Sequence, residues 1–216
     1  MAYDEKAFHF YSSTSQKNVQ RGKGKKFSYR LPSEGLEFSR PSELKHWTNG
    51  KKINVLCIVG AGRVLVWKYY TGALNGATWC DLLHTEVAPA LAEMPSPGRT
   101  FILRDNAPQS HNAKVALDTE ALLRMKVEKQ PSNSPDCSPL DYGLWKLIVK
   151  KMRMTERRWQ KRNPRKIWKE TLAEYKIRLR QTAKRLTQNE VERCMGKMKR
   201  VCAQLVERSG GHIPCD

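Results

Sequence analysis

Three aspartates, Asp4, Asp105 and Asp141, stand where a layered fold could bring their carboxylates to one point. Asp4 lies in a short aromatic-rich segment near the start of the sequence, and Asp105 follows the strand-like run 100–104. Asp141 falls in the first turn of a helix that we expect to begin at Ser138 and Pro139. Because the carboxyl ends of adjacent strands meet in one crevice of an α/β fold, we expect the three side chains to converge.

Three converging carboxylates predict a metal site. They repel one another, and unpaired burial raises their pKa values, a conflict that a divalent cation removes. Oxygen ligands without Cys or His select Mg²⁺ or Mn²⁺ over Zn²⁺. Two such ions, about 3.5–4 Å apart, activate a water or a 3′-hydroxyl and stabilise the leaving oxygen of a phosphodiester. The pattern therefore indicates phosphodiester chemistry with two Mg²⁺ or Mn²⁺ ions per site.

Each aspartate also has a purely structural interpretation. Asp141 could cap its own helix, since Ser138-x-x-Asp141 approximates a capping pair and an anion favours the positive helix end. Asp105, before Asn-Ala-Pro, could form a turn, and Asp4 could be an exposed charge at a strand end. The metal interpretation is favoured because all three occupy strand-end or helix-start positions in the same predicted fold.

The elements around these aspartates alternate between strand and helix signals. Period-2 and apolar runs predict strands, and apolar residues at helical spacing predict helices. The expected strands are 2–11, the hairpin 53–59 with 63–70, 99–105 and 125–130, and the expected helices are 75–91, 113–124 and 139–151. This order predicts an α/β domain over 1–151, a mixed sheet with helices packed on it, interrupted by a polar, basic excursion at 12–52.

The net charge of +19 is concentrated in the last third of the chain, where 146–208 holds 21 Lys or Arg against 6 Asp or Glu. Such asymmetry is typical of a polyanion partner, most often nucleic acid, although a basic but inert solvated surface is the alternative. We expect 152–216 to be a basic helical extension of two helices, the first beginning near Pro164. The expected DNA-binding residues are Lys150, Lys151, Arg153, Arg157, Arg158, Lys161, Arg162, Arg193, Lys197, Lys199 and Arg200.

The second basic helix has a clear start and a one-sided apolar stripe. It opens on the capping box Thr187-x-x-Glu190 and stops at Gly210-Gly211. We expect its apolar stripe to pack against protein, with the thiols in it buried: Val191, Cys194, Met195, Met198, Val201, Cys202 and Leu205.

The six cysteines and five histidines show neither zinc-site spacing nor a disulfide framework. The first residues lack the apolar core of a signal peptide, and no apolar run reaches membrane-spanning length. These observations predict a reducing, intracellular location and no membrane partner.

Four motifs in order resemble the catalytic domain of Tc/mariner transposases, within the DDE/D superfamily: "YDEKAF", "GALNGATWCDLLHTEVAPAL", "ILRDNAP" and "SPDCSPLDYGLW". The resemblance covers about residues 2–151, and "SGGHIP" resembles the end of such proteins. It implies an RNase H-like fold. It also implies a DNA endonuclease and strand-transfer activity in cut-and-paste DNA transposition and integration, a homodimer in a transposition complex, and a nuclear location. No small-molecule substrate is expected.

Carried over by motif, Asp4, Asp105 and Asp141 match the three metal-binding, catalytic acids of the family, the third of which is Asp in mariner-like lineages. Asn106 and Trp145 match positions that support the site. Asp136 matches the aspartate of "SPD", which the resemblance assigns to bracing the loop before the helix.

The sequence departs from the family at two points. Asp105 and Asp141 enclose 35 residues, one more than is usual, and His111 lies one place further from Asp105 than in the family's "DNAPxH", so a residue inserted near Gln109 and Ser110 would explain both. His111 is therefore left out of the catalytic set. Only three residues precede Asp4, where the family carries helix-turn-helix domains, which leads us to expect an N-terminally truncated chain.

Three functions are compatible with these observations. The leading hypothesis is a metal-dependent transposase-derived endonuclease and strand-transfer domain. The second is a catalytically inactive DNA-binding remnant of a transposable element. A nuclease of the same fold that acts on RNA–DNA hybrids is the third, and the motifs do not favour it.

Overall fold

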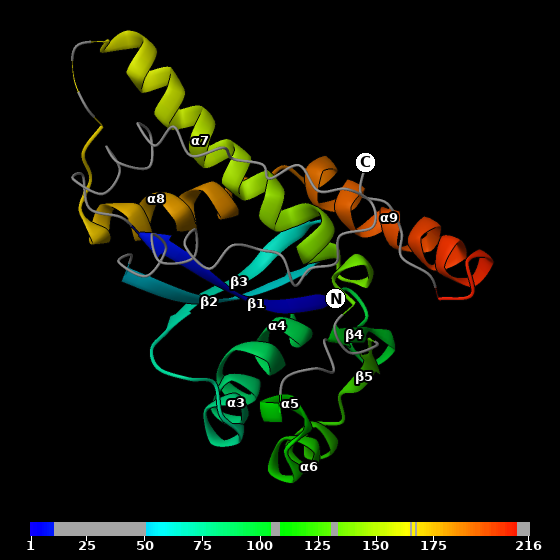
Figure 1. Cartoon of the computed structure of the whole chain (residues 1–216). Coiled ribbons are helices and arrows are strands. Elements are labelled where there is room, and N and C mark those ends of the chain that lie inside the picture. Colours follow the sequence, from blue (N-terminus) through cyan, green and yellow to red (C-terminus); the bar gives the residue numbers. More distant parts are fainter. Residues whose placement is uncertain (11–50, 105–108, 131–133, 165, 167, 211–216) are drawn as a thin grey trace, which may run out of the picture.

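A mixed sheet between two layers of helices forms the body of the computed structural model (Figure 1). The structure describes residues 1–10, 51–104, 109–130, 134–164, 166 and 168–210. Within this part of the chain the strand order is β3-β2-β1-β4-β5. The strands are β1 (Ala2–Phe10), β2 (Lys51–Gly60), β3 (Arg63–Tyr70), β4 (Phe101–Arg104) and β5 (Lys126–Lys129).

The central strand β1 joins an antiparallel half of the sheet to a parallel half. It pairs along its whole length with β2, which continues into β3 through a tight hairpin at Ala61 and Gly62. Both hairpin residues have positive φ, 49° and 70°, as the two-residue turn that matches strand twist requires. On its other side β1 runs parallel to β4, with Ala2 level with Leu103. The predicted strands and hairpin are confirmed, and β1 and β4 are neighbours, which the convergence of Asp4 and Asp105 requires.

Helices cover both faces of this sheet (Figure 1). One layer contains α3 (Gly76–Leu82), the π-helical turn η3 (Leu83–Val87), α4 (Ala88–Ala92), α5 (Gln109–Asn112) and α6 (Lys114–Leu122). The other contains the π-helical turn η6 (Leu140–Leu144), α7 (Trp145–Arg162), α8 (Leu172–Lys184) and α9 (Gln188–Glu207). Two 3-10 turns, η4 (Pro97–Arg99) and η5 (Pro135–Cys137), lie in the connections.

Successive residues of β1 point into two different cores, because side chains of a strand alternate between its faces. Ala2, Phe8 and Phe10 pack beneath α7 and α8, whereas Tyr3 packs against α3. The first core also contains Val55, Trp67, Trp145, Ile148, Leu179 and Val191. The second also contains Leu56, Ile58, Trp79, Leu83, Ile102 and Ala116. The sheet is therefore buried on both sides, and its centre is shielded from water.

The C-terminal helices differ from the sequence-based expectation in two ways. The helix that we expected to end at Lys151 continues to Arg162, so the expected domain division at 151/152 falls inside α7. Pro164 follows this helix, and the next one, α8, begins instead at the capping box of Thr171 and Glu174. The prediction of a helix start near Pro164 was therefore wrong.

The last helix, α9, begins at Thr187 and Glu190 with the capping box that the sequence predicted. The expected apolar stripe is only partly buried. Val191 and Val201 are buried and Cys194 is half-buried, but Cys202 is exposed, so the prediction of two buried thiols was wrong for Cys202. The outer end of α9 extends past the sheet (Figure 1), and Cys202 is not covered by any of the described residues.

Candidate active site

Asp4 lies on the central strand. Its side chain is on the face covered by α7, because alternate residues of a strand share a face and Ala2 and Phe8 pack on that side. Its Oδ2 accepts a 2.7 Å hydrogen bond from the indole Nε1 of Trp145, the first residue of α7. Its Oδ1 accepts a 2.8 Å hydrogen bond from the backbone N–H of Glu5. Trp145 is 1% exposed, so the carboxylate is held from within the core.

Asp141 approaches Asp4 from the helical turn that precedes α7. The hydroxyl of Ser138 accepts a 3.3 Å hydrogen bond from the N–H of Asp141 and so supports the start of this turn. The turn is π-helical, with the N–H of Trp145 donating to the carbonyl of Leu140, five residues earlier. Asp141 and Trp145 are four residues apart and share one side of the helix. One helix start thus supplies both a second carboxylate and the indole that orients the first.

Burial and the charge of Asp141 both act on Asp4. The pKa of Asp4 is raised from 3.8 to about 8, first by burial and then by the charge of Asp141, while the hydrogen bonds from Trp145 and the Glu5 N–H act in the opposite direction. Cys57, the cross-strand neighbour of Asp4, is fully buried, and burial together with the Asp4 charge raises the pKa of its thiol. The thiol therefore stays neutral, and a hard cation at this point would meet carboxylate oxygens.

The structure brings together two of the three predicted metal ligands. Asp105 and Asn106 lie outside the described residues, and Arg104 before them ends β4. Asp136 lies in the turn η5. Among the described side chains, no group of three His, Cys, Asp or Glu gathers as a metal site. The metal-binding and catalytic roles of Asp4, Asp105 and Asp141 stay predictions, as do the supporting roles of Asn106, Asp136 and Trp145.

The carboxylate pair fits a divalent cation chemically. Burial and mutual repulsion penalise ionisation of Asp4, and a cation between the two groups would reverse that penalty. Trp145 occupies one lone-pair direction of Asp4 Oδ2 and the Glu5 N–H one direction of Oδ1, and each carboxylate oxygen can accept more than one partner. Asp4 and Asp141 could thus both ligate a metal ion.

On the opposite face of the sheet, Glu5 pairs with a buried histidine that sequence reasoning left without a role. Nε2 of His111 lies 3.2 Å from Oε1 of Glu5, and the His111 ring packs 4.3 Å from that of Trp79 and 5.9 Å from that of Tyr3, between ring centroids. His111 is fully buried on α5, the helix that follows residues 105–108. This contact ties α5 to the residue next to Asp4.

A buried ion pair lies beside this histidine. Arg104 is fully buried, and its Nε lies 3.1 Å from Oε1 of Glu120 on α6. A second nitrogen of the guanidinium donates to Asn112 at 3.5 Å. The pair anchors the end of β4, immediately before Asp105, to the helices beneath it. No local pattern in the sequence indicated it.

The last helix packs directly on the turn that carries Asp141. The hydroxyl of Tyr142 donates a 2.8 Å hydrogen bond to the carbonyl of Cys194 on α9. A Cβ added at Gly143 would lie only 2.8 Å from the Sγ of Cys194, so glycine is required for the helices to approach this closely. Lys151 on α7 also pairs with Glu190 on α9 at 2.7 Å. The basic C-terminal helix is thus part of the support of the site.

All but one of the predicted DNA-binding residues are exposed on α7 or α9. The exception is Lys151, which is half-buried in its ion pair with Glu190. The exposed ones are Lys150, Arg153, Arg157, Arg158, Lys161 and Arg162 on α7, and Arg193, Lys197, Lys199 and Arg200 on α9.

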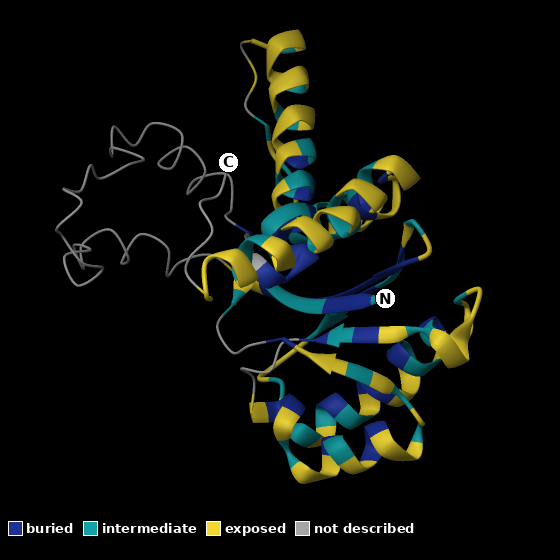
Figure 2. Cartoon of the chain, turned by 90° about the vertical axis from the view of Figure 1, so that its right-hand side faces the viewer, coloured by how far each residue is buried: buried dark blue, intermediate teal, exposed yellow. Residues whose placement is uncertain are grey.

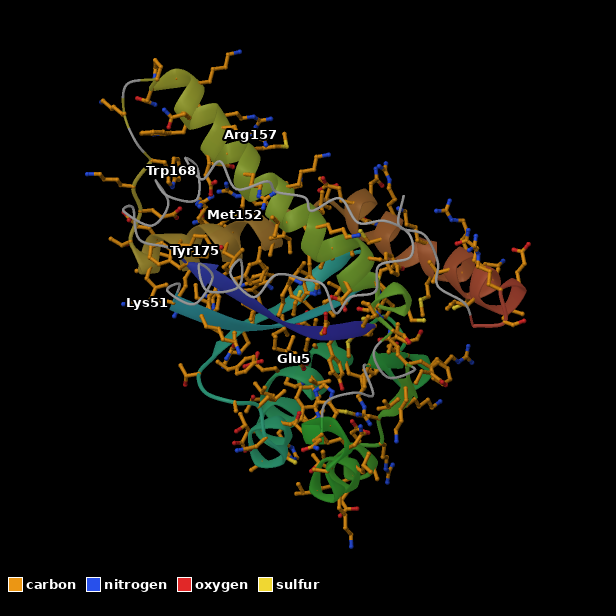
Figure 3. The ribbon with its side chains drawn as sticks, viewed as in Figure 1. Glu5, Lys51, Met152, Arg157, Trp168 and Tyr175 are labelled. Carbon is orange, nitrogen blue, oxygen red and sulfur yellow. The ribbon has the colours of Figure 1, made fainter. Side chains whose placement is uncertain are left out.

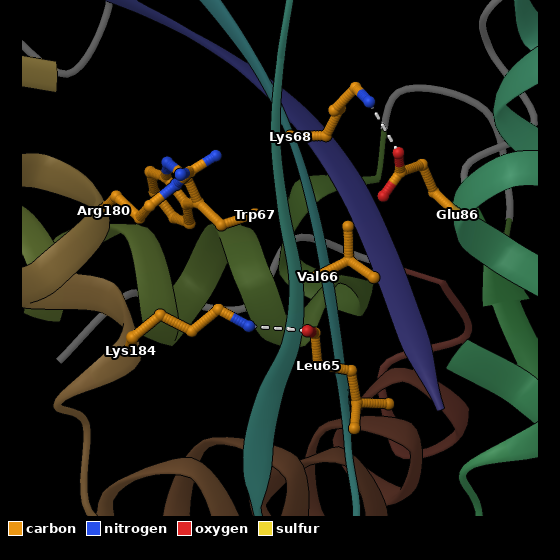
Figure 4. A pocket seen from close by; sticks show the side chains of 7 residues that line it. All are labelled: Leu65, Val66, Trp67, Lys68, Glu86, Arg180 and Lys184. Carbon is orange, nitrogen blue, oxygen red and sulfur yellow. Dashed lines mark hydrogen bonds and ion pairs between the residues drawn. The ribbon is translucent and has the colours of Figure 1, made fainter. Parts of the chain in front are cut away.

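A hollow of about 360 Å³ at the outer edge of β3 lies apart from the acidic pair (Figure 4). Nζ of Lys184 donates to the carbonyl of Leu65 at 2.6 Å, and Lys68 pairs with Glu86 at 2.7 Å. Lys184 thus covers backbone carbonyls at the edge of the sheet, and the Lys68–Glu86 pair joins β3 to η3. We therefore place the candidate site at Asp4 and Asp141.

No helix in the described part of the chain is both long and apolar enough to cross a membrane. No model of a known protein family matches the chain, and no curated protein matches it by sequence.

Solved structures of the same fold do match. The catalytic domain of the Mos1 mariner transposase matches at a TM-score of 0.67 and 17% identity, with 99% of this chain and 83% of that one covered. A pre-cleavage Mos1 transpososome and the Mos1 mariner paired-end complex with Mn each match at a TM-score of 0.69 and 20% identity, covering 99% of this chain. The chain spans 56% of the length of the transposase chains in those two complexes. A mixed sheet with helices on both faces was predicted, and the comparison confirms it: this chain has the RNase H-like fold of the Mos1 transposase catalytic domain.

Proposed function

We propose that this chain is a transposase-type domain that cleaves DNA phosphodiesters with divalent metal ions and transfers the resulting 3′ ends to target DNA. The observation that carries the proposal is the pair of carboxylates, Asp4 and Asp141, that meets at the centre of a Mos1-like fold with Trp145 bonded to one of them. Solved Mos1 structures include a complex with a transposon end, a strand transfer complex, and complexes with Mg or Mn.

The proposal makes Asp105 the third ligand. Leu103 on β4 packs into the core on the α7 face, and Arg104 points to α6 on the other face. Ala2 on β1 is level with Leu103 in the parallel register of β1 and β4, so the strand that ends immediately before Asp105 is the direct neighbour of the strand that carries Asp4.

Each residue of this set has a distinct part in the proposed reaction. Asp4, Asp105 and Asp141 would hold two Mg²⁺ or Mn²⁺ ions, which activate the attacking hydroxyl and stabilise the leaving oxygen when bound. Trp145 fixes the direction of the Asp4 carboxylate and closes the core behind it. The Glu5–His111 and Arg104–Glu120 contacts hold β1, on which Asp4 stands, and β4, which ends immediately before Asp105.

The proposal also covers partners and location. DNA is the proposed partner, in accord with the net charge of +19 and the exposed cations of α7 and α9. A second copy of the chain in a transposition complex and a nuclear location follow from the same function.

Nicking of a supercoiled plasmid in Mg²⁺ or Mn²⁺ tests the activity. We expect the wild type to nick, Asp105→Asn and Asp141→Asn to lose nicking at least a hundredfold, and Asp118→Asn, an exposed aspartate of α6, to match the wild type. If Asp141→Asn nicks as well as the wild type, the site assignment is wrong. DNA binding by a wild type that nicks in neither metal would instead support the catalytically inactive DNA-binding remnant.

A further inference from the structure

The basic side chains of the C-terminal helices divide into two groups. Some are engaged within the fold: Arg178 pairs with Glu156 at 2.8 Å, Lys151 with Glu190 at 2.7 Å, and Lys184 donates to a carbonyl of β3. Others form no ion pair with any carboxylate of the described residues. Seven of these lie on α7, and five of the seven share one face of the helix: Lys146, Lys150, Arg153, Arg157 and Lys161.

These five residues, which we name the α7 stripe, form a straight line on one side of the helix. They are spaced four, three, four and four residues apart, the spacing that keeps side chains on one helical face. All five are exposed, and by helical spacing the buried residues Ile148 and Met152 lie on the other side of α7. Figure 2 shows the same helix exposed over most of its length beyond the sheet. The remaining cations of the helix, Arg158 and Arg162 among them, lie roughly 100° or more around the axis from the centre of the stripe.

The stripe runs outward from the acidic pair. Its helix begins at Trp145, which bonds to Asp4, and extends beyond the sheet, where Arg157 is labelled in Figure 3. From Lys146 to Lys161 the helix advances about 22 Å, at 1.5 Å per residue. A duplex advances 3.4 Å per base pair, so the stripe is about six base pairs long, with a cation about every 6 Å.

We propose that the α7 stripe is the surface along which the backbone of a DNA duplex leaves the active site, and that Lys146 belongs to it. The inference rests on the proposed function, because the direction of the stripe is informative only if the acidic pair acts on DNA. Charge complementarity identifies the occupant: a row of unpaired cations suits regularly spaced phosphates. Trp159 lies on the outer part of α7, beyond the sheet. It is half-buried, because its ring packs against that of Trp168 at 5.3 Å between ring centroids.

Two variants of the same helix test the stripe. Arg153→Gln/Arg157→Gln removes two stripe cations, and Arg158→Gln/Arg162→Gln removes two exposed arginines from another side of α7. Both variants lose two positive charges, so a general electrostatic effect would weaken DNA binding equally in the two. Binding of a fluorescein-labelled 20-base-pair duplex is measured in EDTA between 50 and 200 mM KCl, which keeps binding separate from cleavage.

We expect the slope of log Kd against log salt to fall by about 1.8 for the stripe variant and by less than about 0.5 for the control. Over this fourfold salt range the stripe variant should lose about tenfold less affinity than the wild type. Equal changes in the two variants, a larger change in the control, or a wild type that binds no duplex overturns the inference. Plasmid nicking is measured in parallel: stripe-dependent binding without nicking refutes the proposed function alone, and nicking with equal slopes refutes the stripe alone.

Discussion

Asp4 lowers the stability of the metal-free protein at neutral pH. Its pKa is about 8 in the folded state against an ordinary 3.8, so the folded chain keeps a proton that the unfolded chain has released. Such a group contributes its full stability below pH 3.8, and this contribution is lost as the pH rises toward 8. pH 7 lies roughly three pH units above 3.8, and each unit lowers the free energy of unfolding by about 1.4 kcal/mol. At pH 7 Asp4 therefore lowers the free energy of unfolding by about 4 kcal/mol.

Asp4→Asn removes this loss. An asparagine oxygen can accept from Trp145 or from the Glu5 N–H but not from both, which costs about 1 kcal/mol. In EDTA we therefore expect the variant to exceed the wild type in free energy of unfolding by about 3 kcal/mol at pH 7 and by less than about 1 kcal/mol at pH 5. Urea denaturation followed by tryptophan fluorescence at pH 5, 6, 7 and 8 measures the difference, with the exposed Asp118→Asn as control.

Mg²⁺ supplies a second comparison. A cation that binds only the folded state stabilises it by mass action, so the wild type should gain stability in Mg²⁺ and Asp4→Asn should gain less. The reasoning fails if the difference between the two proteins does not change with pH, or if the variant is the less stable one at pH 7. A wild type that Mg²⁺ does not stabilise would argue against metal binding by this pair.

Two substitutions test the supports of the site. Gly143→Ala places a Cβ 2.8 Å from the Sγ of Cys194 and should lower the free energy of unfolding by about 1–3 kcal/mol. Gly196→Ala, with open space around it in α9, should instead raise the free energy of unfolding by about 0.5–1 kcal/mol. Chemical denaturation measures both variants, and an unchanged stability of Gly143→Ala would contradict the close helix contact. Arg104→Met leaves the carboxylate of Glu120 buried without its partner and should lower the free energy of unfolding by about 3–5 kcal/mol in the same measurement. The double variant Arg104→Met/Glu120→Leu should recover most of this loss. No recovery in the double variant would show that the pair does more than neutralise buried charge.

Local patterns in the sequence were enough to predict the strands and most helices. The hairpin of β2 and β3 was predicted from two apolar runs around a short turn, and the capping box of Thr187 and Glu190 from a four-residue motif. The end of α7 was missed because the expected helix was stopped at a domain boundary. Its apolar side continues through Met152 to Trp159, and Lys and Arg are good helix formers, so nothing ends the helix before Asn163.

The contacts around the site were predictable only in part. The pairing of Asp4 with Asp141 was predicted from strand-end and helix-start positions, and Trp145 was assigned to the site by resemblance alone. The contacts Glu5–His111 and Arg104–Glu120 were not predicted, because they join elements that are adjacent only after the sheet has formed. A buried charged residue produces no periodic pattern in the sequence, and the packing of the folded chain determines which residue pairs with it.

The two π-helical turns affect how related sequences must be aligned. Each turn, η3 and η6, holds one residue more than the same length of α-helix, so a homologue can omit that residue and keep both flanking segments in place. Single-residue gaps should therefore be permitted at 83–87 and 140–144. An alignment that forbids a gap in the second interval would shift Asp141 by one position and wrongly score the acid as lost.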